Sequence, residues 1–165
     1  MQDRINQFAP GTVIKILAPL FLVVLILKLY LATVLDLYSD EVFYWLESTH
    51  PALAYSDLPF MTAMLTGLGA SLSPGQALAA RSVFLLLGTS LPLLVYWIAR
   101  PITNQLQALE SAVLTLCLPL GAFVGLLAVP DVPLLFFGLL SIGLFERALR
   151  LGEFKFWIGT GLVVA

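Results

Sequence analysis

Two long apolar runs limit what this chain can fold into more than any other feature. The segments "LAPLFLVVLIL" and "VFLLLGTSLPLLVYWIA" contain no charged side chain and no polar face that water could solvate. Soluble domains use about one charged residue in four, whereas this chain is 60% hydrophobic and 11% charged. The sequence therefore predicts an all-α fold, a polytopic bundle of transmembrane helices surrounded by membrane lipids.

Charge and cysteine content exclude several other classes. The net charge is −2 and the sequence has no cluster of Lys or Arg, so no nucleic acid is expected as a partner. The single cysteine, Cys117, excludes an intrachain disulfide. The first apolar run continues past Leu27, longer than the core of a signal peptide, which is about 7 to 15 residues. This run is therefore expected to be retained as the first span.

The number of spans follows from length, because a helix that crosses the hydrocarbon layer needs about 20 mainly apolar residues. The sequence predicts spans at about 11–35, 82–99, 111–130, 132–149 and 156–165. The last of these is too short to cross and is expected to be incomplete. Residues 1–165 are therefore expected to be the N-terminal part of a larger membrane domain, and to be inactive alone.

The charge distribution decides whether the weakly apolar segment 61–72 spans the membrane. If it does not, and if the N-terminus is cytoplasmic, Arg81 lies outside while six basic residues lie inside: Arg4, Lys15, Arg100, Arg147, Arg150 and Lys155. If it does span, four of these six move outside, against the positive-inside rule. Segment 61–72 is therefore predicted to be a re-entrant or interfacial helix within one extracytoplasmic loop, 36–80.

Six carboxylates then share the extracytoplasmic side: Asp36, Asp40, Glu41, Glu47, Asp57 and Asp131. Asp131 lies in the short turn "VPDVP" between two spans, where a carboxylate is partly desolvated and needs a nearby donor. The stretch "SDEVFYWLEST" predicts a short interfacial helix that Ser39 or Asp40 caps and that ends at His50-Pro51. Tyr44 and Trp45 are expected to anchor this helix at the interface.

Three motifs together resemble a known family. They are Asp-Glu followed by "FYW" just after the first span, "ALAYSDLPF" about a dozen residues later, and "VPDVPLLFF" at the start of the fourth span. In this order the chain resembles the N-terminal part of the GT-C polyprenyl-phosphate-sugar-dependent membrane glycosyltransferases. That group includes the protein O-mannosyltransferases and the aminoarabinose transferases.

The resemblance implies a glycosyltransferase that moves a hexosyl or pentosyl unit from a polyprenyl-phosphate donor. The acceptor would be a lipid, a glycan or a protein at the extracytoplasmic face of the plasma (inner) membrane. Asp40 matches the catalytic aspartate of the family, and Glu41 would orient the acceptor or help to hold a divalent cation. Such a displacement needs a carboxylate to take the proton of the acceptor and cations to stabilise the leaving phosphate.

The remaining candidates come from the residues themselves. Arg81 at the outer end of the second span, and Lys28 within the first, are candidate ligands for the lipid phosphate. Asp57 and Asp131 are secondary acidic candidates. The carboxylates offer oxygen ligands suited to Mg, Mn or Ca, but no spacing fixes a set of them, so any cofactor beyond a possible divalent cation is unknown.

Each candidate has a structural alternative. Asp40 and Glu41 can serve as the negative first turn of a helix, and Asp57 as a turn residue. Asp131 can cap the helix that follows it, and Arg81 and Lys28 can extend to the headgroups. For the whole chain, the alternatives are a non-catalytic truncated membrane module and a transporter segment. The sequence shows no internal repeat and its acids gather on one side, which disfavours the transporter.

Overall fold

Every regular element of the described chain is an α-helix. The computed structural model describes residues 10–52, 54–55, 59–73, 76–118 and 123–164, and it contains no strand within those ranges. This confirms the predicted all-α class.

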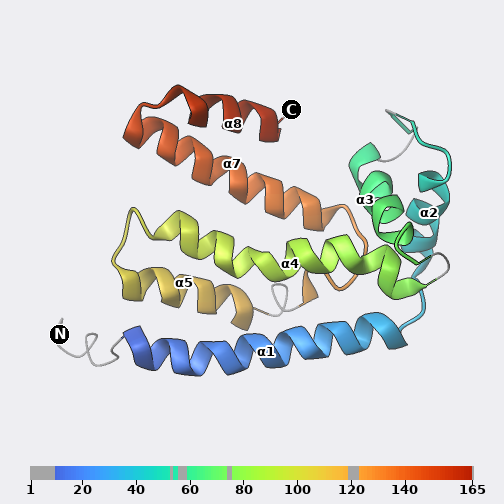
Figure 1. Cartoon of the computed structure of the whole chain (residues 1–165), viewed down its shortest axis with the longest axis horizontal. Coiled ribbons are helices and arrows are strands. Elements are labelled where there is room, and N and C mark those ends of the chain that lie inside the picture. The colour runs from blue at the N-terminus through green and yellow to red at the C-terminus, as the bar shows by residue number, and fades with distance from the viewer. Residues whose placement is uncertain (1–9, 53, 56–58, 74–75, 119–122, 165) are drawn as a thin grey trace.

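Three long helices run side by side and form the body of the molecule: α1 (Pro10–Val34), α4 (Ala77–Ala99) and α7 (Asp131–Leu151) (Figure 1). At 1.5 Å per residue, each is about 32 to 38 Å long, enough to cross a bilayer core of about 30 Å. α4 is the central helix and packs against both of the others. They correspond to the expected spans 11–35, 82–99 and 132–149, although α4 begins five residues earlier than expected.

Composition supports a membrane environment for this bundle. Among the described residues, α4 and α7 are each long and apolar enough to cross a membrane. A third span results if residues 18–34 and the next helix, bent from them by 77°, are counted as one. Large apolar side chains such as Leu86 and Leu134 are also exposed on the outer faces of these helices. Lipid chains rather than water are the solvent that such faces require.

Two short helices, α2 (Ser39–Ser48) and α3 (Phe60–Ala70), lie together at one end of the long helices (Figure 1). As expected for segment 61–72, α3 does not run the length of the bundle. α3 crosses α4 very closely, since a Cβ atom built at Gly69 would lie 2.2 Å from the carbonyl oxygen of Ala79. The last helix, α8 (Phe154–Val164), folds back onto α7.

The expected helix 111–130 is wrong as a continuous element. α5 (Gln105–Cys117) ends after 13 residues, and its C-cap, Leu118, is extended with φ −66° and ψ 130°. Leu118 precedes Pro119, and the proline ring disfavours the helical conformation in the residue before it. Residues 124–130, here called the 124–130 segment, are not helical.

The 124–130 segment nevertheless lies in the core. Val124, Leu126 and Ala128 are 7%, 6% and 0% exposed, and they pack with Phe84 and Leu85 of α4. Non-helical backbone at membrane depth is tolerated only where protein groups satisfy its polar atoms. The backbone N–H and C=O groups of this segment therefore need partners within the protein.

Two glycines allow the 124–130 segment to approach α4. A Cβ atom at Gly88 would lie 2.3 Å from the carbonyl oxygen of Val124, so only glycine fits there without a shift of backbone. Gly125 faces Gly88 and has φ +87°, a conformation that glycine adopts at low cost. The close contact of these two residues seats the segment on the central helix.

Gly88→Ala is expected to destabilise the protein by about 1 to 3 kcal/mol, the usual cost of overpacking a well-packed core. The matched control is Gly138→Ala on α7, where a built Cβ meets no atom within 4 Å. That change should be neutral or stabilising by up to about 1 kcal/mol, because alanine favours a helix over glycine. Denaturant unfolding in detergent micelles measures both. Equal stability of the two variants would contradict the close contact.

Candidate functional site

Glu41 begins the site in the first turn of α2 and is fully buried, with 0% exposure. The N-cap of α2 is Tyr38, one residue before Ser39 and two before Asp40, the two expected caps. The backbone N–H of Tyr38 donates to Oε2 of Glu41 at 3.0 Å. This is the reciprocal half of a capping box, in which an acidic residue at the third helical position satisfies the N–H of the N-cap.

Arg81 of α4 lies opposite Glu41 and is also 0% exposed. Its Nε and Nη2 atoms donate to the two oxygens of Glu41 at 2.8 and 2.6 Å, a bidentate ion pair. Its other donations go to three carbonyl oxygens at and just after the C-terminal end of α1, at 2.8 to 3.1 Å: Ala32, Leu35 and Asp36. A guanidinium has five N–H donors, and all five are used here.

These contacts give Arg81 a clear local role. The last carbonyls of a helix have no partner within the helix, and a cation near them also interacts favourably with the helix dipole. Arg81 supplies hydrogen-bond donors to these carbonyls of α1 and places a positive charge at the C-terminal end of that helix. It also joins α1, α4 and α2 at one point. The sequence predicted Arg81 as a phosphate ligand. To bind a phosphate it would have to release one of its present acceptors.

Glu41 also holds the 124–130 segment. Its Oε1 accepts a hydrogen bond from the backbone N–H of Ala128 at 2.8 Å. Burial by itself raises the pKa of Glu41, but the hydrogen bonds from Arg81, Ala128 and Tyr38 outweigh it, so the pKa is held below its ordinary value. Glu41 is thus ionised at neutral pH and fastens the start of α2, the central helix and the 124–130 segment together.

Lys28 of α1 also forms a hydrogen bond with the 124–130 segment. It is 4% exposed, and its Nζ donates to the carbonyl oxygen of Val124 at 2.7 Å. An unsatisfied backbone group in hydrocarbon costs several kcal/mol. Lys28 and Glu41 therefore satisfy a carbonyl and an amide of the 124–130 segment, 96 and 87 residues away along the chain. The predicted phosphate contact of Lys28 stays a prediction.

Asp40, next to Glu41, is exposed and has a different environment. Asp131, the first residue of α7, is exposed at the same end of the bundle. Tyr44 of α2 connects them: burial raises the pKa of its phenol, and the negative charges of Asp40 and then Asp131 raise it further. Both carboxylates thus lie within electrostatic range of one nearly buried hydroxyl. Neither forms an ion pair with another described residue.

The position of Tyr44 differs from the expected one. Sequence reasoning made it an interface anchor, but Tyr44 is only 5% exposed and packs inward on the same side of α2 as Glu41. Val42 and Leu46 are 44% and 52% exposed and cover the outer side instead. Glu41 and Tyr44 are three residues apart and therefore lie on one face of a helix, so this spacing in the sequence could have indicated that both turn inward.

Two further predictions concern Asp57 and a site for a divalent cation. Asp57 lies outside the described residues. Within the part of the chain that the structure describes, no group of three or more His, Cys, Asp or Glu residues is placed to hold a metal ion. Asp40 and Asp131 are both exposed, and the negative charge of each raises the pKa of Tyr44.

No curated protein and no solved structure matches the chain. A family model described as dolichyl-phosphate-mannose-protein mannosyltransferase matches residues 57–165. The match includes Arg81 and Asp131, and it begins after Asp40 and Glu41. Because it covers well over half of the 165 residues, the chain belongs to the dolichyl-phosphate-mannose-protein mannosyltransferase family, within the GT-C type of glycosyltransferases.

Proposed function

We propose that this chain provides the catalytic end of a membrane glycosyltransferase that transfers a sugar from a polyprenyl-phosphate donor to an acceptor hydroxyl. The family match supports the reaction class. The observation that carries the assignment to this end of the molecule is that Asp40, in the first turn of α2, and Asp131, the first residue of α7, are both exposed there (Figure 1). These are exposed carboxylates without a described ion pair, where a reactant can reach them.

Asp40 is the proposed general base. The acceptor oxygen attacks the anomeric carbon of the sugar, the bond from that carbon to the phosphate oxygen breaks, and the phosphate leaves with both bonding electrons. The proton of the acceptor hydroxyl goes to a carboxylate oxygen of Asp40. Asp131, the first residue of α7, is proposed to orient the acceptor, since a carboxylate accepts hydrogen bonds from sugar or protein hydroxyls.

Glu41 and Arg81 are proposed as positioning residues. Glu41 was predicted to orient the acceptor or to hold a cation, but its two oxygens already accept four hydrogen bonds from Arg81, Ala128 and Tyr38. These bonds fix the first turn of α2, and with it the backbone of Asp40, relative to α4 and the 124–130 segment. Rigid placement of a base matters because misplacement by about 1 Å can cost a hundredfold in rate.

The donor class is tested by an assay in membranes that contain the full-length protein. A polyprenyl-phosphate-linked mannose is expected to give labelled acceptor, and a nucleotide-linked mannose is expected to give none once synthesis of the lipid-linked donor is blocked. A mixture of peptides, glycans and lipids serves as the acceptor pool. Transfer from the nucleotide sugar alone would overturn the proposal. Absence of any transfer by the well-expressed protein would favour the non-catalytic module.

The membrane orientation is also a proposal: the end that carries α2 and α3 faces the extracytoplasmic side, and the N-terminus is cytoplasmic. The support is the distribution of Lys and Arg under the positive-inside rule. In a background in which the exposed Cys117 is replaced by alanine, a cysteine at Ser73 should react with an impermeant reagent added outside intact cells. A cysteine at Asn104, between α4 and α5, should react only after lysis. The reverse pattern would invert the orientation.

A further inference from the structure

Tyr44 is a nearly buried residue whose hydroxyl has no hydrogen-bond partner in the structure. The residue is 5% exposed, and no hydrogen bond joins its hydroxyl to another residue in the described part of the chain. The buried polar atoms that lack a partner among the described residues are Oγ1 of Thr62 and Oε2 of Glu146, and the Tyr44 oxygen is not one of them. An unpaired oxygen that is not buried must reach the surface. The ring of Tyr44 is therefore packed within the protein while its hydroxyl is open to a ligand.

The hydroxyl of Tyr44 lies at the end of the bundle that carries Asp40 and Asp131. Aromatic side chains in a helix lean toward its N-terminus and cover the residues three and four positions earlier, which for Tyr44 are Glu41 and Asp40. Glu41 accepts a hydrogen bond from the backbone N–H of Ala128 at 2.8 Å, and Asp131 follows Ala128 by three residues, a reach of at most about 11 Å. Burial raises the pKa of Tyr44, and the charges of Asp40 and then Asp131 raise it further. The phenol therefore keeps its proton at neutral pH.

A protonated hydroxyl supplies what the groups around it lack, a free hydrogen-bond donor. Ionised carboxylates only accept hydrogen bonds. All five N–H donors of Arg81 go to Glu41 and to carbonyls at the end of α1, and the hydroxyl of Ser39 donates to Oδ1 of Asp40 at 3.4 Å. A hydroxyl group of a ligand has lone pairs as well as a proton, so it is held best by a donor that lies beside carboxylates.

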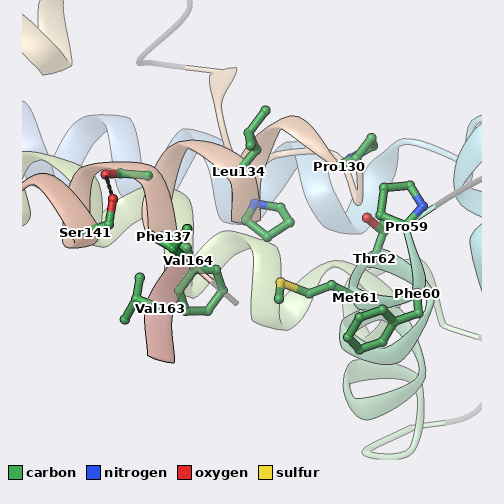
Figure 2. Close-up of a pocket in the computed structure, with 12 residues that line it drawn as sticks. Pro59, Phe60, Met61, Thr62, Pro130, Leu134, Phe137, Ser141, Val163 and Val164 are labelled. Atoms are coloured by element: carbon green, nitrogen blue, oxygen red, sulfur yellow. Dashed lines mark hydrogen bonds between the residues drawn. The ribbon is translucent and has the colours of Figure 1, made fainter. Parts of the chain in front are cut away.

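A groove between α3, α7 and α8 offers no comparable donor (Figure 2). It has a volume of about 480 Å³, and no charged residue lines it. Of its two hydroxyl-bearing residues, Ser141 already donates to the carbonyl oxygen of Gly138 at 2.7 Å, and Oγ1 of Thr62 is buried. The side chains of this groove thus leave no hydroxyl free for a sugar, unlike the end that carries Tyr44.

We propose that the Tyr44 hydroxyl donates a hydrogen bond to a hydroxyl oxygen of the transferred sugar, which makes Tyr44 a substrate-binding residue. This inference rests on the proposed function. Charge favours the sugar over the donor phosphate as the partner, because Asp40 and Asp131 repel an anion. The sugar is neutral and gains positive charge as its bond to the phosphate breaks. The attacking oxygen of the acceptor is an unsuitable partner, since a hydrogen bond to its lone pair would weaken the attack.

The test combines Tyr44→Phe with donors that each lack one hydroxyl of the sugar. Membranes with the full-length protein receive polyprenyl-phosphate mannose or one of its monodeoxy analogues, and kcat/KM is measured for each. One analogue is expected to lower the kcat/KM of wild type about five- to tenfold, the loss of one hydrogen bond of ordinary strength. Tyr44→Phe should lose the same factor with the normal donor. The same analogue should then cost the variant less than about twofold, because the hydrogen bond is already absent.

Tyr96→Phe, near the opposite end of α4, is the matched control and should keep the wild-type ranking of the donors. The unfolding temperature of Tyr44→Phe should match that of wild type, because the hydroxyl that it removes has no partner in the described chain.

Three results would overturn the contact between Tyr44 and the sugar. They are wild-type kcat/KM in Tyr44→Phe, a wild-type protein that accepts every analogue as well as mannose, and a loss in Tyr44→Phe that is the same factor for all donors. The last result would place the hydroxyl against the phosphate or the acceptor. Absence of transfer by the wild-type protein would instead overturn the proposed function, and this inference with it.

Discussion

Replacing Arg81 with methionine is expected to destabilise the protein by about 3 to 5 kcal/mol, the usual cost of removing one partner of a buried ion pair. Glu41 would remain ionised or take up a proton in a fully buried place, and three carbonyl oxygens at the end of α1 would lose their donors. Unfolding in detergent micelles, followed by circular dichroism, measures the loss. Arg150→Met is the control, because that arginine pairs with Glu146 in an exposed i, i+4 contact, which contributes little.

A double-mutant cycle separates the pair from its surroundings. Glu41→Gln should also be strongly destabilising, and the double variant should be less destabilised than the sum of the two single variants by at least about 2 kcal/mol, since the partners are in direct contact. Recovery should be incomplete because the carbonyls of α1 still lack donors. Strict additivity of the two changes would show that Arg81 and Glu41 are not coupled in the folded protein.

The ion pair of Glu41 and Arg81 also makes the stability of the fold depend on pH. The pKa of Glu41 in the folded protein lies below its ordinary value, so its contribution to stability is fully present above that ordinary value. The contribution is lost as the pH falls through the lower folded-state value. Glu41→Gln should lack this part of the acid sensitivity, which a pH series of the same unfolding measurement would show.

Asp40→Asn is expected to lower the turnover of sugar transfer by about 10² to 10⁴, the typical contribution of a general base. The amide occupies the space of the carboxylate but cannot take the proton of the acceptor. A structural effect is expected to be small, because Tyr38 rather than Asp40 is the N-cap of α2 and asparagine is tolerated near helix starts. The assay is transfer from a polyprenyl-phosphate sugar by the full-length protein, with expression and unfolding measured in parallel.

Asp36→Asn provides the matched control for that experiment. Asp36 is another exposed carboxylate at the same end, and only its backbone carbonyl contacts Arg81. Its turnover should stay within about threefold of wild type. If Asp40→Asn also stays within threefold at normal expression, Asp40 is not the base. The proposed mechanism would then have to move to Asp131.

The predictable part of this protein followed from one-dimensional features. Uninterrupted apolar length predicted the helices that the structure has as α1, α4 and α7, because a chain in lipid must satisfy its backbone within helices. The early end of α5 also had a local signal in Pro119, which the apolar continuity of 111–130 concealed. The charge pattern placed 61–72 outside the set of spans, and three short motifs identified the family.

The roles of the charged residues were decided by the tertiary structure. Glu41 and Asp40 are adjacent, but a rotation of about 100° between successive helical residues turns Glu41 into the core and leaves Asp40 exposed. Which of the two faces inward depends on Arg81, 40 residues later, and on the amide of Ala128, 87 residues later. A local sequence pattern cannot reveal contacts between residues that are so far apart along the chain. Arg81 and Lys28 likewise find their partners at the end of α1 and in the 124–130 segment, which come near them only once the bundle has assembled.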